Sequence, residues 1–183
     1  MNLREKLDLL RRTEAEHHFG VIIEESTNPE PVPDLPPAVT EVFTLFSRLG
    51  GDNFRFLQPS DIATPATWAE RHIDPYCPLG NPLRIGCERH GAPADIECGS
   101  GIYLDLEDGD VYFCDGDDYV HAYENTDLET VETTELAPDI ATFFDHHVLG
   151  AGYPRLVTAT IGDHALHRPD NWRKLLHHSG LLD

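Results

Sequence analysis

GIYLDLEDGDVYFCDGDDYVHAY, residues 101–123, is the stretch that decides the fold of this chain. Apolar and polar residues alternate over residues 102–107, and an apolar run resumes at 111–113 after the pair Asp108-Gly109. Alternation with period two is typical of a strand with one buried face, and Asp-Gly supplies the positive φ that a tight hairpin turn needs. We predict two antiparallel strands joined by a hairpin, with a third strand at residues 119–123.

The rest of the chain predicts helices that can cover this antiparallel meander. Apolar residues recur at helical spacing in several segments, with Asn, Asp or Pro at their starts and Gly at their ends. The fold class expected is therefore α+β, an antiparallel β-sheet with helices packed on it. We expect a helix capped by Asn2, helices at 37–49 and 138–150, a last helix capped by Asp170, and further strands at 54–57, 83–88 and 155–161.

Three segments are expected along the chain. Residues 1–34 should form an N-terminal helix and a proline-rich linker, because five prolines fall between residues 28 and 37. Residues 35–150 should form the α+β domain. Residues 151–183 should form a strand and helix extension that packs on the domain.

Charge is the most informative feature of the composition. The 183 residues carry a formal net charge of −20, and no Lys or Arg occurs in residues 90–154, which hold 16 of the 33 acidic residues. A polyanion such as nucleic acid, or an anionic membrane surface, is excluded as a direct partner by this charge. A basic protein is the partner we expect.

Four cysteines, at positions 77, 87, 98 and 114, form no C-x-x-C pair. This spacing signals neither a zinc knuckle nor a redox pair. The first twenty residues lack the apolar run of a signal peptide, and no segment is apolar enough to span a bilayer. We expect a cytoplasmic protein with reduced thiols.

Four stretches together resemble the SUKH superfamily, which is named for a fungal cell-wall assembly regulator and for bacterial toxin-immunity proteins. They are LPPAVTEVFTLFSRLGG (35–51), PLRIG (82–86), GIYLDLEDGDVY (101–112) and TFFDHHV (142–148). The resemblance spans residues 35–150 and implies helices on an antiparallel sheet. It also implies a binding module without catalytic residues, and many members lie beside toxins whose nuclease or deaminase domains they inhibit.

Histidines and acidic residues raise the question of a metal site. Adjacent histidines occur at 17/18, 146/147 and 177/178, but neighbours on a helix point about 100° apart and cannot chelate as a pair. The acidic run at 105–118 lacks the ligand spacing of a calcium loop. We expect no metal, no cofactor and no catalytic site.

Turn chemistry explains only some of the carboxylates in the meander. Asp108 and Asp115 precede glycines, as turns favour, whereas the other acids there are not required by a turn. The partner-binding residues that we expect are Glu107, Asp110, Asp115, Asp117, Asp118 and Tyr119.

The function expected is an immunity-type module that inhibits a basic toxin domain, nuclease- or deaminase-like, by docking an acidic sheet surface over it. One alternative is an intracellular scaffold or regulatory module with an endogenous protein partner. A metal-dependent hydrolase, built from the acidic and histidine residues, is the third and weakest alternative.

Overall fold

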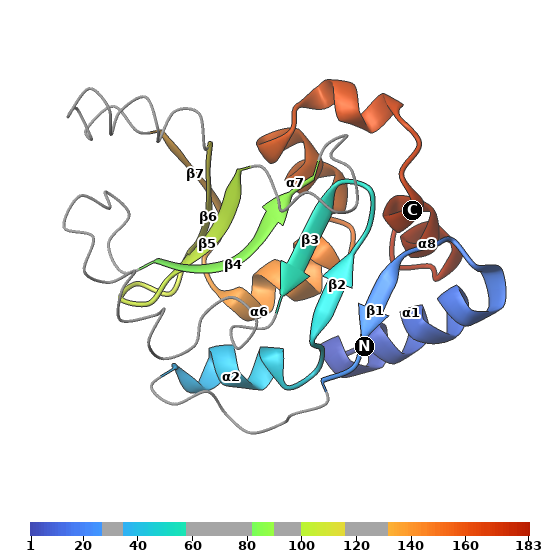
Figure 1. Cartoon of the computed structure of the whole chain (residues 1–183), viewed down its shortest axis with the longest axis horizontal. Coiled ribbons are helices and arrows are strands. Elements are labelled where there is room, and N and C mark those ends of the chain that lie inside the picture. The colour runs from blue at the N-terminus through green and yellow to red at the C-terminus, as the bar shows by residue number, and fades with distance from the viewer. Residues whose placement is uncertain (27–34, 58–81, 90–99, 116–131) are drawn as a thin grey trace.

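A seven-stranded antiparallel sheet forms the centre of the computed structural model, which describes residues 1–26, 35–57, 82–89, 100–115 and 132–183 (Figure 1). The strands lie in the sheet in the same order as in the chain, and every neighbouring pair is antiparallel. The predicted α+β class and the central hairpin are confirmed. The strands are β1 (Ile22–Glu24), β2 (Arg48–Gly50), β3 (Phe54–Leu57), β4 (Pro82–Glu88), β5 (Gly101–Asp105), β6 (Val111–Cys114) and β7 (Thr133–Ala137).

Helices pack against one face of this sheet and share its core (Figure 1). The described helices are α1 (Leu3–His17), α2 (Pro37–Phe43), α6 (Ile140–Thr142), the π-helix η2 (Phe143–Val148), α7 (Tyr153–Thr160), the 3₁₀-helix η3 (Asp163–His167) and α8 (Asn171–His178). The third strand expected at residues 119–123 lies outside the described residues.

The first helix begins as its sequence predicts. The Asn2 side chain accepts a hydrogen bond from the backbone N–H of Glu5, and the Glu5 carboxylate accepts one from the backbone N–H of Asn2. This reciprocal capping box satisfies two N–H groups that no helical carbonyl can reach. Leu7 and Leu10, one helical face of α1, are fully buried in the core.

The helix expected at 37–49 is too long, because α2 ends at Phe43 and the chain re-enters the sheet as β2. Leu49 pairs with Ile23 of β1 on one side and with Phe56 of β3 on the other. Phe46 lies in the connection and still contacts Phe43, with ring centroids 5.5 Å apart. The apolar residues of this segment are buried in a turn and a strand instead of in a helix. Long-range strand pairing therefore determines the structure here, against the helical spacing of the sequence.

The strand expected at 155–161 is also wrong, since this segment is helix α7. Pro154 occupies the first turn of α7, where its missing N–H has no consequence. Tyr153, Leu156 and Val157 are buried at the i, i+3, i+4 spacing of a helical face. That spacing indicated a helix, but the β-branched residues of the segment favoured the prediction of a strand.

The helix expected at 138–150 forms, but most of it is the π-helix η2. Asp139 caps its start by accepting from the backbone N–H of Thr142. Phe143, Phe144 and Val148 face the core as expected, and the Phe144 ring lies 5.1 Å from Phe46 and 5.4 Å from Phe56. The wider π turn lets two consecutive phenylalanines enter the core together.

Two histidines at the end of η2 pack closely on Gly152. A Cβ at this glycine would lie 2.7 Å from Cδ2 of His146 and 2.8 Å from Nδ1 of His147, so a larger residue here would displace these rings. His147 is 7% exposed, and burial lowers its pKa below 6.5, with smaller contributions from His146 and Arg155. A hydrogen bond with the Gly152 backbone opposes part of this shift.

The cysteines depart from the expectation of reduced thiols. Cys87 on β4 is disulfide-bonded, whereas Cys114 on β6 is a buried free thiol. Both positions pair with Gly101 of β5, so they lie on the same face of the sheet, two strands apart.

A buried carboxylate joins the last helix to the turn between β2 and β3. Asp170 is 2% exposed, and its Oδ2 accepts hydrogen bonds from Asn53 Nδ2 at 2.8 Å and from the Tyr153 hydroxyl at 2.9 Å. Its Oδ1 accepts from the backbone N–H of Arg173 and caps α8, as the sequence predicts. Burial, followed by the nearby Asp170 carboxylate, raises the pKa of Tyr153 well above 10.

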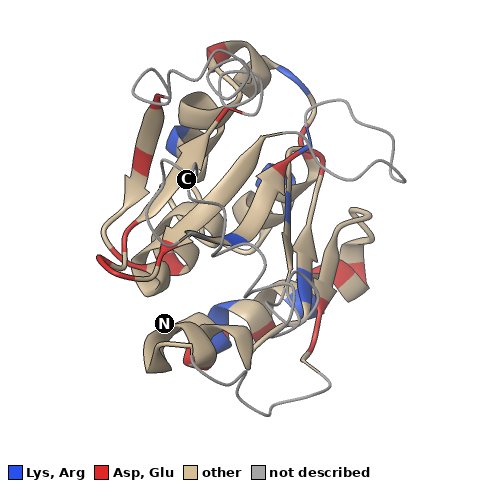
Figure 2. Cartoon of the chain, turned by 60° about the vertical axis from the view of Figure 1, so that its left-hand side comes forward, with Lys and Arg blue, Asp and Glu red and all other residues tan. Residues whose placement is uncertain are grey.

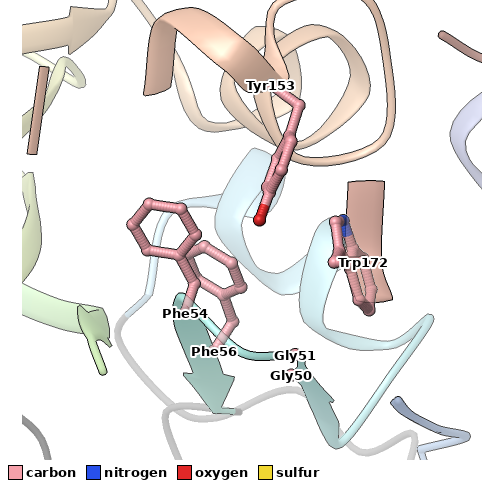
Figure 3. Close-up of a pocket in the computed structure, with 6 residues that line it drawn as sticks. All are labelled: Gly50, Gly51, Phe54, Phe56, Tyr153 and Trp172. Carbon is pink, nitrogen blue, oxygen red and sulfur yellow. The ribbon is translucent and has the colours of Figure 1, made fainter. Parts of the chain in front are cut away.

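Aromatic packing completes this junction (Figure 3). Phe54, Phe56, Tyr153 and Trp172 surround the backbone of Gly50-Gly51, and the gap between them is too narrow to admit a water molecule. A Cβ at Gly51 would lie 2.9 Å from Cβ of Trp172. The junction is therefore packed core rather than a ligand pocket.

Asp170→Ala should lower the free energy of unfolding by roughly 3 to 5 kcal/mol, because it removes a helix cap and leaves two buried donors without an acceptor. Urea unfolding followed by circular dichroism measures the change. Asp163→Ala, at an exposed carboxylate, is the control and should cost less than about 0.5 kcal/mol. Equal losses for the two variants would contradict the role given to Asp170.

His147 should make the protein less stable in mild acid. The unfolded chain takes up this proton near pH 6.5, whereas the folded chain does so only at lower pH, so stability is lost as pH falls from 6.5 through the folded pKa. His147→Gln should flatten the dependence of the urea midpoint on pH between 7.5 and 5. A His167→Gln control, at an exposed ring, should retain it. An unchanged slope in His147→Gln would show that other groups cause the acid sensitivity.

Candidate functional site

The acidic residues singled out by sequence are placed at two ends of strand β6. Glu107 and Asp110 lie in the turn between β5 and β6, whereas Asp115 follows β6 at its other end, beside Ser100. The two ends are roughly 17 Å apart, at about 3.4 Å per residue. The structure therefore does not bring Asp115 together with Asp110, and Asp117, Asp118 and Tyr119 lie outside the described residues.

The β5–β6 turn is longer than the two-residue turn expected from Asp108-Gly109. It spans residues 106–110, with Gly109 at φ +87°, and the backbone N–H of Asp105 donates to the carbonyl of Asp110 at 2.9 Å. The carboxylate that holds the turn is Asp105, whose Oδ1 accepts from the backbone N–H of Glu107 at 2.7 Å. This is an Asx turn, and it leaves the side chains of Glu107 and Asp108 exposed.

A further carboxylate, Glu135 on β7, joins this end of the sheet. Glu135 pairs with Tyr112 across the β6–β7 ladder, and its charge helps raise the pKa of Asp110. Glu135 was not among the site residues predicted from sequence. The signal that could have placed it was its position in a strand, two residues before Ala137. We call the set Asp105, Glu107, Asp108, Asp110 and Glu135 the acidic rim; acidic residues are red in Figure 2.

The chemistry of the acidic rim is that of carboxylates gathered around Asp110. Burial raises the pKa of Asp110 above its usual 3.8, and the Asp105, Asp108 and Glu135 charges raise it further. Only a hydrogen bond to the backbone opposes the shift. Asp110 is therefore held in a negative potential, which favours the approach of a cationic group.

Next to the acidic rim, one row of side chains crosses four strands on the face away from the core. Arg84, Tyr103, Tyr112 and Glu135 pair in register across β4, β5, β6 and β7. The two tyrosine rings are stacked as a cross-strand pair, with centroids 5.8 Å apart and planes 20° apart. The Tyr103 ring also covers Gly101, where a Cβ would lie 2.4 Å from Cε2 of that ring.

A groove and the distribution of metal-ligating side chains are two further features of the surface. A surface groove of about 390 Å³ lies between the start of α1, α2 and α6, and Arg4 and Glu41 are the charged residues among its described lining. Among the described residues, no group of three or more His, Cys, Asp and Glu side chains is placed to hold a metal ion. In the same part of the chain, no helix is long and apolar enough to cross a membrane.

Comparison with known proteins identifies no relative: no family model matches the chain, and neither curated proteins nor solved structures show a significant similarity.

Asp110→Asn should stabilise the protein at pH 7. Because the folded pKa of Asp110 is raised, its stability contribution is present below pH 3.8 and lost as pH rises through the folded pKa. Solvent screens this partly exposed group, so the expected gain is only a few tenths of a kcal/mol. Thermal unfolding at pH 7 and pH 4 measures it, with Asp163→Asn as the control. A gain equal at both pH values would argue against charge repulsion.

Proposed function

We propose that the chain is a protein-binding module that docks a basic partner on the acidic rim. The observation that supports this proposal is the convergence of carboxylates from two chain segments, the β5–β6 turn and β7, around Asp110. Like charges gathered in this way repel one another and lower the stability of the fold. The same carboxylates attract a cationic surface on a partner. Residues 90–154 contain no Lys or Arg, so this stretch of the sequence supplies no positive charge that would oppose the attraction.

Within this proposal, the partner is a cognate toxin domain of the nuclease or deaminase class. Enzymes that act on nucleic acid carry cationic surfaces for their polyanionic substrate. An acidic rim presented to such a surface blocks substrate by occupying its site, so inhibition is stoichiometric and needs no catalysis. The resemblance to SUKH immunity proteins supports this reading, and the cytoplasm is the proposed location.

The regulatory alternative has the same surface but a different partner. A scaffold module would bind an endogenous protein whose expression alone is harmless to the cell. The immunity proposal requires that the captured partner arrests growth when expressed alone, and that co-expression of this chain restores growth. Partner identity and this growth assay therefore separate the two functions.

Reversing three charges of the acidic rim should weaken partner capture. The variant Glu107→Lys, Asp108→Lys, Asp110→Lys changes the net charge from −20 to −14. Wild-type and variant chains are immobilised, and native lysate is passed over each at low and high salt. Wild type should retain more of the partner than the variant does, and association with the variant should be slower by about tenfold or more at low ionic strength.

The matched control reverses three exposed acids elsewhere, Glu41, Asp163 and Asp183, and has the same net charge of −14. It should capture the partner as wild type does. If the control loses the partner equally, net charge rather than the acidic rim drives binding. If neither variant loses it, the partner docks on another surface.

A further inference from the structure

The C-terminal ends of α1 and α8 meet, on the side of the molecule away from the acidic rim (Figure 1). His17 ends α1 and His178 ends α8, and their rings lie 5.2 Å apart with planes at 56°. A hydrogen bond from Ser179 Oγ to Thr13 Oγ1 at 3.2 Å also joins the two helices here. The fold thus brings together one histidine from each of two His-His pairs.

The ring separation is compatible with two imidazoles on one metal ion. A ligated nitrogen lies about 2.0–2.1 Å from zinc, which places the ring centroid about 3.2 Å from the ion. At a tetrahedral angle between ligands, two such centroids are about 5.2 Å apart. The His17 and His178 rings show this separation before any ion binds.

Surrounding groups set the orientation of both rings. His178 Nδ1 lies 3.2 Å from the carbonyl oxygen of Lys174, so with Nδ1 as the donor its Nε2 keeps the lone pair that a metal needs. The Phe19 ring packs edge-on against His178 at 5.0 Å and lies 5.8 Å from His17. A carboxylate oxygen of Glu16 lies 4.0 Å from Nε2 of His17.

The electrostatic setting favours a cation. Each helix places the negative end of its dipole at this junction. The Glu14 carboxylate also lies here and accepts from the backbone N–H groups of Phe19 and Gly20. The ammonium of Lys174 bonds Asn171 Oδ1 at the start of α8, one turn away from the junction.

We propose that His17 and His178 form a binding site for a divalent transition metal ion of the zinc, nickel and copper class, which imidazole ligands favour. The protein supplies two nitrogen ligands and water completes the coordination. The ion would clamp the first helix to the last one. This site lies apart from the acidic rim and does not depend on the proposed function.

Isothermal titration of the full chain with Zn²⁺, and separately with Ni²⁺, tests the proposal. Wild type should bind one ion at this site, and His17→Ala or His178→Ala should each weaken binding by at least about tenfold, because one imidazole cannot chelate. His177→Ala is the matched control, since its ring lies on the same helix with Nδ1 against the Leu182 carbonyl. Equal weakening by the control, or no effect of either variant, would overturn the site.

Two readouts separate metal ligation from a structural role of the rings. With Cu²⁺, electron paramagnetic resonance should show two coordinated nitrogens in wild type and one in His178→Ala. Zn²⁺ should raise the thermal midpoint of wild type and of His177→Ala but not of His17→Ala, since only an ion bound to the folded state stabilises it. An unchanged nitrogen pattern in His178→Ala would contradict the proposal whatever its stability.

Discussion

The buried carboxylate of Asp170 is the interaction on which the arrangement of the chain depends. It accepts from Asn53 after β2, from Tyr153 at the start of α7 and from the first turn of α8. A buried charge is tolerated only when its lone pairs are satisfied, so these three elements must hold one relative position. The sheet, the helices and the last segment of the chain are therefore fixed to one another, and α1 and α8 both contribute to the same core.

The described helices cover one face of the sheet, whereas charged side chains lie at the strand ends and on the opposite face. On that opposite face Arg48, Arg55 and Arg84 belong to β2, β3 and β4, whereas the acidic rim belongs to the β5–β6 turn and β7. The stacked Tyr103 and Tyr112 rings lie between the two sets of charges. This separation explains why the nearest charges raise the pKa of Asp110 rather than lower it.

The elements that the sequence predicted correctly are those whose ends are set by bonds between residues close in sequence. The Asn2 and Asp170 caps, the β5–β6 hairpin and the strand after Gly51 all depend on residues within a few positions of one another. The elements that sequence misjudged depend on distant partners: Leu49 is held in a strand by Ile23 and Phe56. The same limit applied to the site, where Glu135 reaches Asp110 through strand pairing and not through proximity in sequence.

The histidines show most clearly that spacing in the sequence does not reveal contacts between distant elements. Neighbouring histidines on a helix diverge, so each His-His pair taken alone excludes chelation. Packing α1 against α8 replaces that intrahelical geometry with an interhelical one, in which the spacing depends on the helix contact and not on sequence separation. It also places two negative helix ends side by side, an arrangement that repels unless a positive group lies between them. A cation held by the two rings removes that repulsion, so the contact that creates the ligand pair also creates the electrostatic reason to occupy it.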